Sequence, residues 1–173
     1  FFRANISLTE EWTKMTDLDD ALWRAAECGH RSRELVDLFI AKGADDWNGA
    51  LRCAAFNGHR ELVDLISEAA KGACDWNYAL YCAAEGGQRS RELVDLFIDK
   101  GAGESAGSLN WTLRCAATGG HRELVDLFIN KGADDLNSAL YCAARKGHRE
   151  LAKYLEALFI EKGAEDIKKL IDK

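Results

Sequence analysis

The sequence predicts an all-α protein, a right-handed α-solenoid of stacked helix-turn-helix repeats with a capping helix at each end. The first observation is recurrence, because five near-copies of one pattern begin 27 to 33 residues apart. The second is the helical periodicity of apolar residues within each copy. The third is composition, since 47% apolar and 30% charged residues are typical of a folded protein. One helix pair cannot bury its apolar side alone, so the repeats are expected to share a continuous core.

We expect a single domain over residues 1–173. Residues 1–16 do not fit the repeat, and Ser7-Leu8-Thr9-Glu10 has the spacing of a capping box. This spacing predicts a short helix from Thr9 to Met15 that covers the first repeat. Residues 165–173 are expected to form the second cap as a short separate helix. The repeats between the caps are predicted at about 17–46, 47–75, 76–108, 109–135 and 136–164.

The first helix of each repeat should begin just after an Asn or Asp, because these side chains accept hydrogen bonds from free amides at a helix start. A large apolar residue precedes each such position and should act as a hydrophobic staple. Each first helix should end at the glycine of a Gly-His or Gly-Gln pair. The predicted N-cap residues are Asp19, Asn48, Asn77, Asn110 and Asn137.

The second helix of each repeat is represented by residues 122–131. Leu124, Leu127 and Phe128 are spaced i, i+3, i+4, which predicts that these three form its buried face. Insertions fall mainly in connections, and residues 101–108 are expected to form a flexible loop from their Gly and Ser content. Ser32 and Ser90 each lie between two arginines, which is typical of a kinase site, but we favour N-caps for the second helices.

One repeat carries a recognisable family pattern. It reads Gly49-Ala50-Leu51-Arg52-Cys53-Ala54-Ala55, followed by Gly58-His59-Arg60-Glu61-Leu62-Val63-Asp64-Leu65, and it resembles the ankyrin repeat. The resemblance covers roughly residues 19–164. It departs from the family in lacking the proline of the first helix and about six residues of the β-hairpin finger. The joint from Gly43 to Asn48 is similar to short ankyrin-like repeats of large amoebal DNA viruses. The resemblance implies protein–protein interaction, with no catalytic, metal or cofactor site.

Cysteines and histidines also recur in register. Cys53, Cys82, Cys115 and Cys142 share one position, and stacked helices about 8–10 Å apart separate their sulfurs too far for disulfides or a shared metal ion. We expect buried or half-buried free thiols. The histidines follow glycine in four repeats, and Gln88 replaces the histidine in the third. Because Gln is not a usual base or metal ligand, we expect these side chains to bond backbone across the turn between repeats.

Three positions on one face of each first helix vary between repeats, while the alanines and leucine on the opposite side stay nearly constant. Spacing of i, i+3, i+7 places each trio on the same face. Trp, Tyr and Arg are enriched at binding hot spots, so this face is our candidate partner-binding surface. The alternative is that these side chains are staples and solvated surface. We call the following set the aromatic–arginine column: Trp23, Arg52, Phe56, Tyr78, Tyr81, Glu85, Trp111, Arg114, Tyr141 and Arg145.

The remaining features limit the function. The net charge is −6 and basic residues alternate with acidic ones, which argues against nucleic-acid binding. No apolar run is long enough to span a membrane. We therefore expect a non-enzymatic, monomeric adaptor that binds an unidentified protein in the reducing cytoplasm, or in the host cytoplasm for a viral protein. The alternative is an engineered or consensus-derived repeat scaffold without a natural partner, favoured by the near-identity of the repeats.

Overall fold

The computed structural model describes residues 17–28, 33–87 and 91–171, with side chains through Gly163. Within these ranges it contains ten helices and no strand, which confirms the all-α solenoid class. The helices form five consecutive pairs. They are α2 (Leu18–Cys28) with α3 (Arg33–Ala41), α4 (Trp47–Asn57) with α5 (Arg60–Ala69), α6 (Trp76–Gly86) with α7 (Arg91–Asp99), α8 (Ala106–Gly119) with α9 (Arg122–Asn130), and α10 (Leu136–Arg145) with α11 (Arg149–Ile171).

Several predicted features lie outside the described residues and are not tested. These are the N-terminal cap with the helix from Thr9 to Met15, the capping roles of Ser32 and Ser90, and the bonds of His30 and Gln88.

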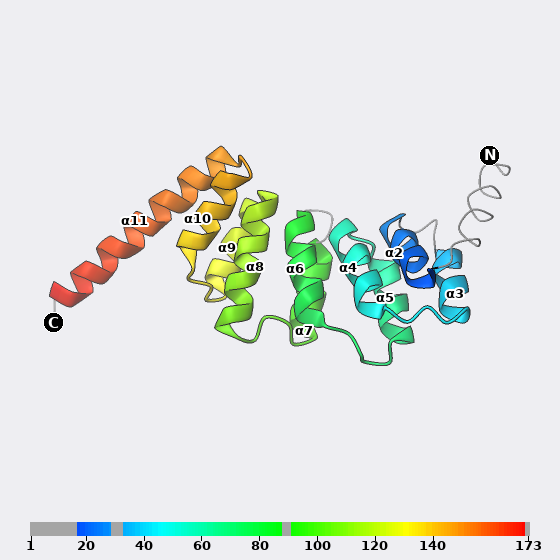
Figure 1. The fold of residues 1–173 in the computed structure, drawn as a ribbon. Helices are drawn as coiled ribbons and strands as arrows, with labels where there is room; N and C mark the ends of the chain where they lie inside the picture. The colour runs from blue at the N-terminus through cyan, green and yellow to red at the C-terminus, as the bar shows by residue number, and fades with distance from the viewer. Residues whose placement is uncertain (1–16, 29–32, 88–90, 172–173) are drawn as a thin grey trace.

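The five first helices stand side by side in one row, with α2 at one end and α10 at the other (Figure 1). Each first helix packs against the first helix of the next repeat, whereas the second helices approach one another less closely. This arrangement places the variable positions of the first helices on one continuous surface.

The core follows the predicted pattern in the first helices. Ala50, Leu51, Ala54 and Ala55 are at most 1% exposed, and their counterparts in α2 and α6 are equally buried. The second helices contribute one fully buried phenylalanine each in three repeats, at Phe39, Phe97 and Phe128. Burying a side chain of this size stabilises the fold by about 2–3 kcal/mol.

The predicted buried face of the second helix was partly wrong. In α9 the buried residues are Leu124, Val125 and Phe128, whereas Leu127 is only half-buried. The buried face therefore includes Val125, and Leu127 packs against the core from a half-buried position. Spacing alone could not separate these neighbouring positions.

The predicted helix N-caps were also wrong by two residues or more. Asp46 caps α4 by accepting from the Gly49 amide at 2.9 Å, so Asn48 lies inside the helix. Asp75, Ser105 and Asp135 cap α6, α8 and α10 in the same manner. The large apolar residue at the start of α4, α6 and α10 is therefore the first helical residue, and the predicted staple spacing does not apply.

Four of the five side chains predicted as caps instead join neighbouring repeats. Asn48 Oδ1 accepts from the Asp75 amide at 2.8 Å, and Asn77 Oδ1 accepts from the Gly103 amide at 2.9 Å. Asp19 and Asn110 accept from the backbone before α4 and α10 in the same way. Each bond satisfies an amide of the loop that leads into the next repeat.

Two segments have more helix than expected. Residues 106–108, predicted as part of a flexible loop, form the first turn of α8, which Ser105 caps. The predicted separate C-terminal cap helix is wrong, because α11 continues without a break from Arg149 to Ile171. Figure 1 shows α11 extending away from the row of helices beyond α10.

Candidate functional site

The aromatic–arginine column lies on the surface side of the first helices, opposite the buried alanines and leucines. Four of its aromatic residues are exposed: Phe56 by 44%, Tyr78 by 43%, Trp111 by 47% and Tyr141 by 64%. Arg145 is also exposed, and the other five members are half-buried. The four exposed aromatic residues lie on four consecutive first helices, α4, α6, α8 and α10.

Contacts between neighbouring helices join much of the column. The Arg52 guanidinium carbon lies 5.9 Å from the Trp23 ring centroid, which links α4 to α2. The Tyr81 and Trp111 ring centroids are 6.1 Å apart, which links α6 to α8. Within α6, Tyr78 and Tyr81 meet edge to face at 6.5 Å and 87°. These are favourable geometries for aromatic pairs and for cations over rings.

Polar partners hold two members of the column in place. The Tyr81 hydroxyl is 3.1 Å from the Ser108 hydroxyl, which donates in turn to Asn77 Oδ1 at 2.6 Å. The neighbouring Tyr78 hydroxyl raises the pKa of Arg52, mainly through a side-chain hydrogen bond. The sequence did not predict that Asn77 and Ser108 contact the column, because Asn77 was predicted as a helix cap and Ser108 as part of a loop.

At two junctions, a side chain of the column packs against the variable position of the next repeat. Trp23 of the first repeat lies over Gly49 of the second, and a Cβ at Gly49 would collide with the indole nitrogen. At the corresponding junction between the third and fourth repeats, Tyr81 lies against Trp111. A large residue on one helix thus faces either a glycine or a ring on the next, so some of these side chains also stabilise the stack.

The structure does not bring every predicted residue into this cluster. Tyr141 and Arg145 lie on α10 at the end of the row and make no ring contact or ion pair within the described part of the chain. Glu85 serves the stack through its backbone, since its carbonyl accepts a bond from His121. The joined part of the column therefore runs from α2 to α8.

The cysteines at the repeated position are half-buried free thiols, as predicted. Burial raises the pKa of Cys82 to about 11 and that of Cys115 to about 12, from an ordinary value of 9.0. Burial also raises the pKa of Cys53 and Cys74. A raised pKa leaves little thiolate at neutral pH, so these thiols are weak nucleophiles. Cys28 is exposed.

The predicted histidine bonds are confirmed wherever the structure describes them. His59 Nε2 donates to the Glu27 carbonyl at 3.0 Å, His121 to the Glu85 carbonyl at 3.0 Å, and His148 to the Thr118 carbonyl at 2.8 Å. Each bond joins the turn of one repeat to the end of the first helix in the repeat before it. Among the described residues no group of three or more His, Cys, Asp or Glu could hold a metal ion.

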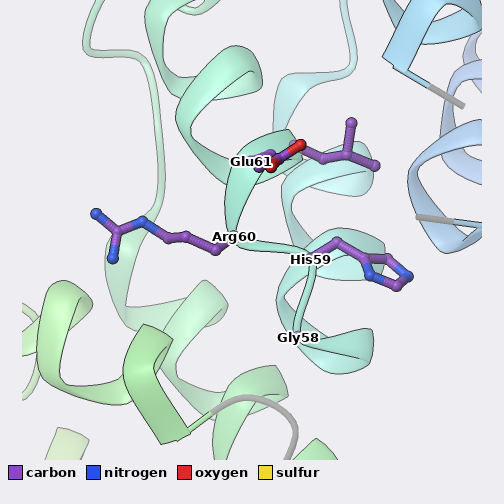
Figure 2. Close-up of a pocket in the computed structure, with 5 residues that line it drawn as sticks. Gly58, His59, Arg60 and Glu61 are labelled. Atoms are coloured by element: carbon purple, nitrogen blue, oxygen red, sulfur yellow. The ribbon is translucent and has the colours of Figure 1, made fainter. Parts of the chain in front are cut away.

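Two shallow hollows in the described part of the chain lie away from the column. One, of about 230 Å³, is lined by five consecutive residues from Gly58 to Leu62. Figure 2 shows His59 pointing toward the first repeat and Arg60 pointing the opposite way, so the side chains do not converge on a ligand. The other, of about 270 Å³, lies beside the loop after α7, between Ala102, Leu109 and Lys131. Sequence reasoning predicted neither hollow.

The fold and the stacked helix pairs define a helical repeat protein. The family model "Ankyrin repeats (3 copies)" matches residues 80–166, half of the chain, and the chain belongs to the ankyrin-repeat family. Ankyrin repeats are generally protein–protein interaction modules, and the family is a non-enzymatic interaction fold. Comparison with curated protein sequences finds no match. In the part of the chain that the structure describes, no helix has the length and apolarity needed to cross a membrane.

Proposed function

We propose that the protein is a non-enzymatic adaptor that binds a partner protein through the aromatic–arginine column. The observation that carries this proposal is the exposure of Phe56, Tyr78, Trp111 and Tyr141 on four consecutive first helices. Exposed aromatic side chains cost little conformational entropy when they become buried, because they have few rotatable bonds. Rings and guanidinium groups are also the side chains that most often dominate binding energy.

The rigidity of the joined part supports the same proposal. Tyr81 is held by Ser108 and packs on Trp111, so these rings are already ordered before a partner arrives. Pre-ordered contacts lower the free energy lost on association. The half-buried thiols and the histidines bonded to backbone support a structural role for the other recurring residues, and so favour binding over catalysis.

The test is affinity capture from cell lysate with the wild-type protein and two triple variants. The first carries Tyr81→Ala, Trp111→Ala and Arg114→Ala in the column. The second carries Arg60→Ala, Glu61→Ala and Arg122→Ala, exposed positions on second helices. We expect proteins recovered with the wild type to be recovered with the second variant and lost with the first. Equal recovery with both variants, which circular dichroism should show to be folded, would contradict the proposal.

The second candidate is an engineered or consensus-derived scaffold without a natural partner. The near-identity of the second helices, such as residues 91–98 and 122–129, favours this candidate. In that case the capture experiment should recover no protein reproducibly with any of the three forms.

We further propose that the chain acts as a monomer in the cytoplasm. The free thiols fit a reducing compartment, where disulfides rarely form. Light scattering after size exclusion tests the monomer, because a molar mass twice that of the 19.2 kDa chain would contradict it. Fluorescence microscopy of the tagged protein in cells tests the compartment.

A further inference from the structure

Six arginines of the described chain differ in what their guanidinium groups contact. Four of them form ion pairs with an aspartate four residues away on the same helix, at 3.0 to 3.8 Å. Arg52 and Arg114, in the column, form no ion pair with any described residue and lie against aromatic rings instead. The ion-paired arginines are Arg24, Arg60, Arg91 and Arg122.

The guanidinium groups of Arg52 and Arg114 lie against rings instead of carboxylates, and that of Arg52 also contacts the Tyr78 hydroxyl. The Arg114 guanidinium carbon lies 4.4 Å from the Trp111 ring centroid, and that of Arg52 lies 5.9 Å from the Trp23 centroid. Nε of Arg114 is buried and meets no acceptor among the described residues. Stacking orients the planar guanidinium, so less freedom is lost when its outer N–H groups form two parallel bonds to a carboxylate.

Their spacing suits an extended chain. Arg52 lies on α4 and Arg114 on α8, with α6 between them. Two steps between packed helices cover about 16–20 Å. An extended peptide advances about 3.3 Å per residue, so the two arginines correspond to positions about five or six residues apart. The edge-to-face pair Tyr78 and Tyr81 lies on α6, between the two arginines.

We propose that this surface binds an extended acidic segment of the partner protein. One carboxylate contacts Arg52, a second contacts Arg114, and an apolar side chain between them packs on Tyr78 and Tyr81. This inference rests on the proposed function and specifies the chemistry of the partner. The net charge of −6 and the presence of Glu85 in the same column favour separate carboxylates over a polyanion, which needs clustered cations.

The experiment is a selection from a displayed library of random twelve-residue peptides on the wild-type protein. The selected peptides are then synthesised and their affinities measured by fluorescence polarisation. We expect enrichment of Asp or Glu at two positions five or six residues apart, with an apolar residue between them. Arg52→Gln with Arg114→Gln should weaken binding by at least about tenfold, because bonds to charged groups are lost.

The matched control is Arg60→Gln with Arg122→Gln. It removes the same charge from second helices, and Arg122 also lies over a ring, that of Tyr154 at 3.8 Å. Binding to this variant should stay within about twofold of the wild type, since exposed ion pairs contribute little. Thermal unfolding of all variants should show that the fold is kept.

Four results would overturn the inference. They are peptides without paired acidic residues, acidic peptides that bind the Arg52 and Arg114 variant as tightly as the wild type, enrichment of basic peptides, and a selection that enriches nothing. A third variant, with Tyr81→Ala and Trp111→Ala, separates the two levels of the proposal. If the selected peptides bind the arginine variant but not this third variant, the acidic segment is wrong and the proposed binding surface stands. If the peptides bind both variants as tightly as the wild type, the proposed binding surface is contradicted as well.

Discussion

The block Ala-Leu-Tyr-Cys-Ala-Ala occurs at residues 79–84 on α6 and again at residues 139–144 on α10. On α6, Leu80 and Ala84 are fully buried. On α10, Leu140 is half-buried and Ala144 is exposed. The tyrosine differs in the same direction, being half-buried on α6 and 64% exposed on α10. Six identical residues thus have different environments in the third and fifth repeats.

The difference arises from the neighbour that follows each helix. The first helix of the fourth repeat, α8, packs on α6, whereas the described element that follows α10 is its own partner α11. The apolar surface that one repeat offers to the next is therefore left uncovered on α10. Composition alone does not decide burial in a stacked repeat, because each repeat is completed by the one after it.

Truncation of the leucines in the two blocks should give the largest difference in the free energy of unfolding. Leu80→Ala should lower the free energy of unfolding by about 3 kcal/mol, because it leaves a cavity in a closed core. Leu140→Ala should cost only about 1 kcal/mol, since the side chain is already partly in water. Urea unfolding followed by circular dichroism measures both values. Equal losses would show that α10 is covered in solution.

Gly49 tests how closely one repeat covers the next. Gly49→Ala should cost about 1–3 kcal/mol, because the new Cβ must displace the Trp23 indole. The control is Gly107→Ala on α8, where the nearest atom to a new Cβ is the Ser105 hydroxyl oxygen at 4.0 Å. That change should be neutral or add up to about 1 kcal/mol of stability through helix propensity. Urea unfolding, with Trp fluorescence as the probe, compares the two, and a stabilised Gly49→Ala protein would contradict the structure.

Substitutions of Tyr81 and Tyr141 should differ less in their effect on the free energy of unfolding. Tyr81→Phe removes the hydroxyl that meets Ser108 and should lower the free energy of unfolding by about 1 kcal/mol. Tyr141→Phe changes an exposed side chain and should stay within about 0.5 kcal/mol of the wild type. Thermal unfolding with matched buffers resolves this difference. A loss at Tyr141 as large as that at Tyr81 would indicate a contact on α10 that the structure lacks.

At neutral pH the effect of Cys82 should be the smallest, because its contribution to the free energy of unfolding changes only in alkaline solution. Its pKa is about 11 in the folded chain and 9.0 for an ordinary thiol. The unfolded chain therefore releases this proton at lower pH, so the free energy of unfolding should fall as the pH rises from about 9 to 11. Cys82→Ala should reduce that fall, measured by urea unfolding at several pH values. An identical pH profile in the variant would contradict a raised pKa.

Much of the fold could be predicted from the sequence because the repeats restate the same pattern. The order of helices and the buried alanines follow from periodicity, and the histidine bonds follow from the substitution of Gln88. The helix starts could not be predicted, because Asp46 and Asn48 are both good N-cap residues two positions apart. Only the geometry between repeats assigns Asp46 to the cap and Asn48 to the neighbouring loop.

The candidate site was predicted as a set of residues, without its internal contacts. Helical spacing places Tyr81 and Trp111 on corresponding faces, but their packing depends on how α6 and α8 are offset. The contact between Tyr81 and Ser108 also depends on the extra turn of α8, which a segment rich in Gly and Ser did not suggest. The role of the column in binding stays a prediction.

The bonds between repeats give the molecule a local kind of cooperativity. At the junction of the fourth and fifth repeats, Asn110 accepts a hydrogen bond from the Asp135 amide, and His148 bonds the Thr118 carbonyl. Because each of these hydrogen bonds joins adjacent repeats, local unfolding of α4 can affect α10 only through the third and fourth repeats. The rate of amide hydrogen exchange should therefore vary along the row, slowest in α6 and faster in α10, instead of being the same in all repeats.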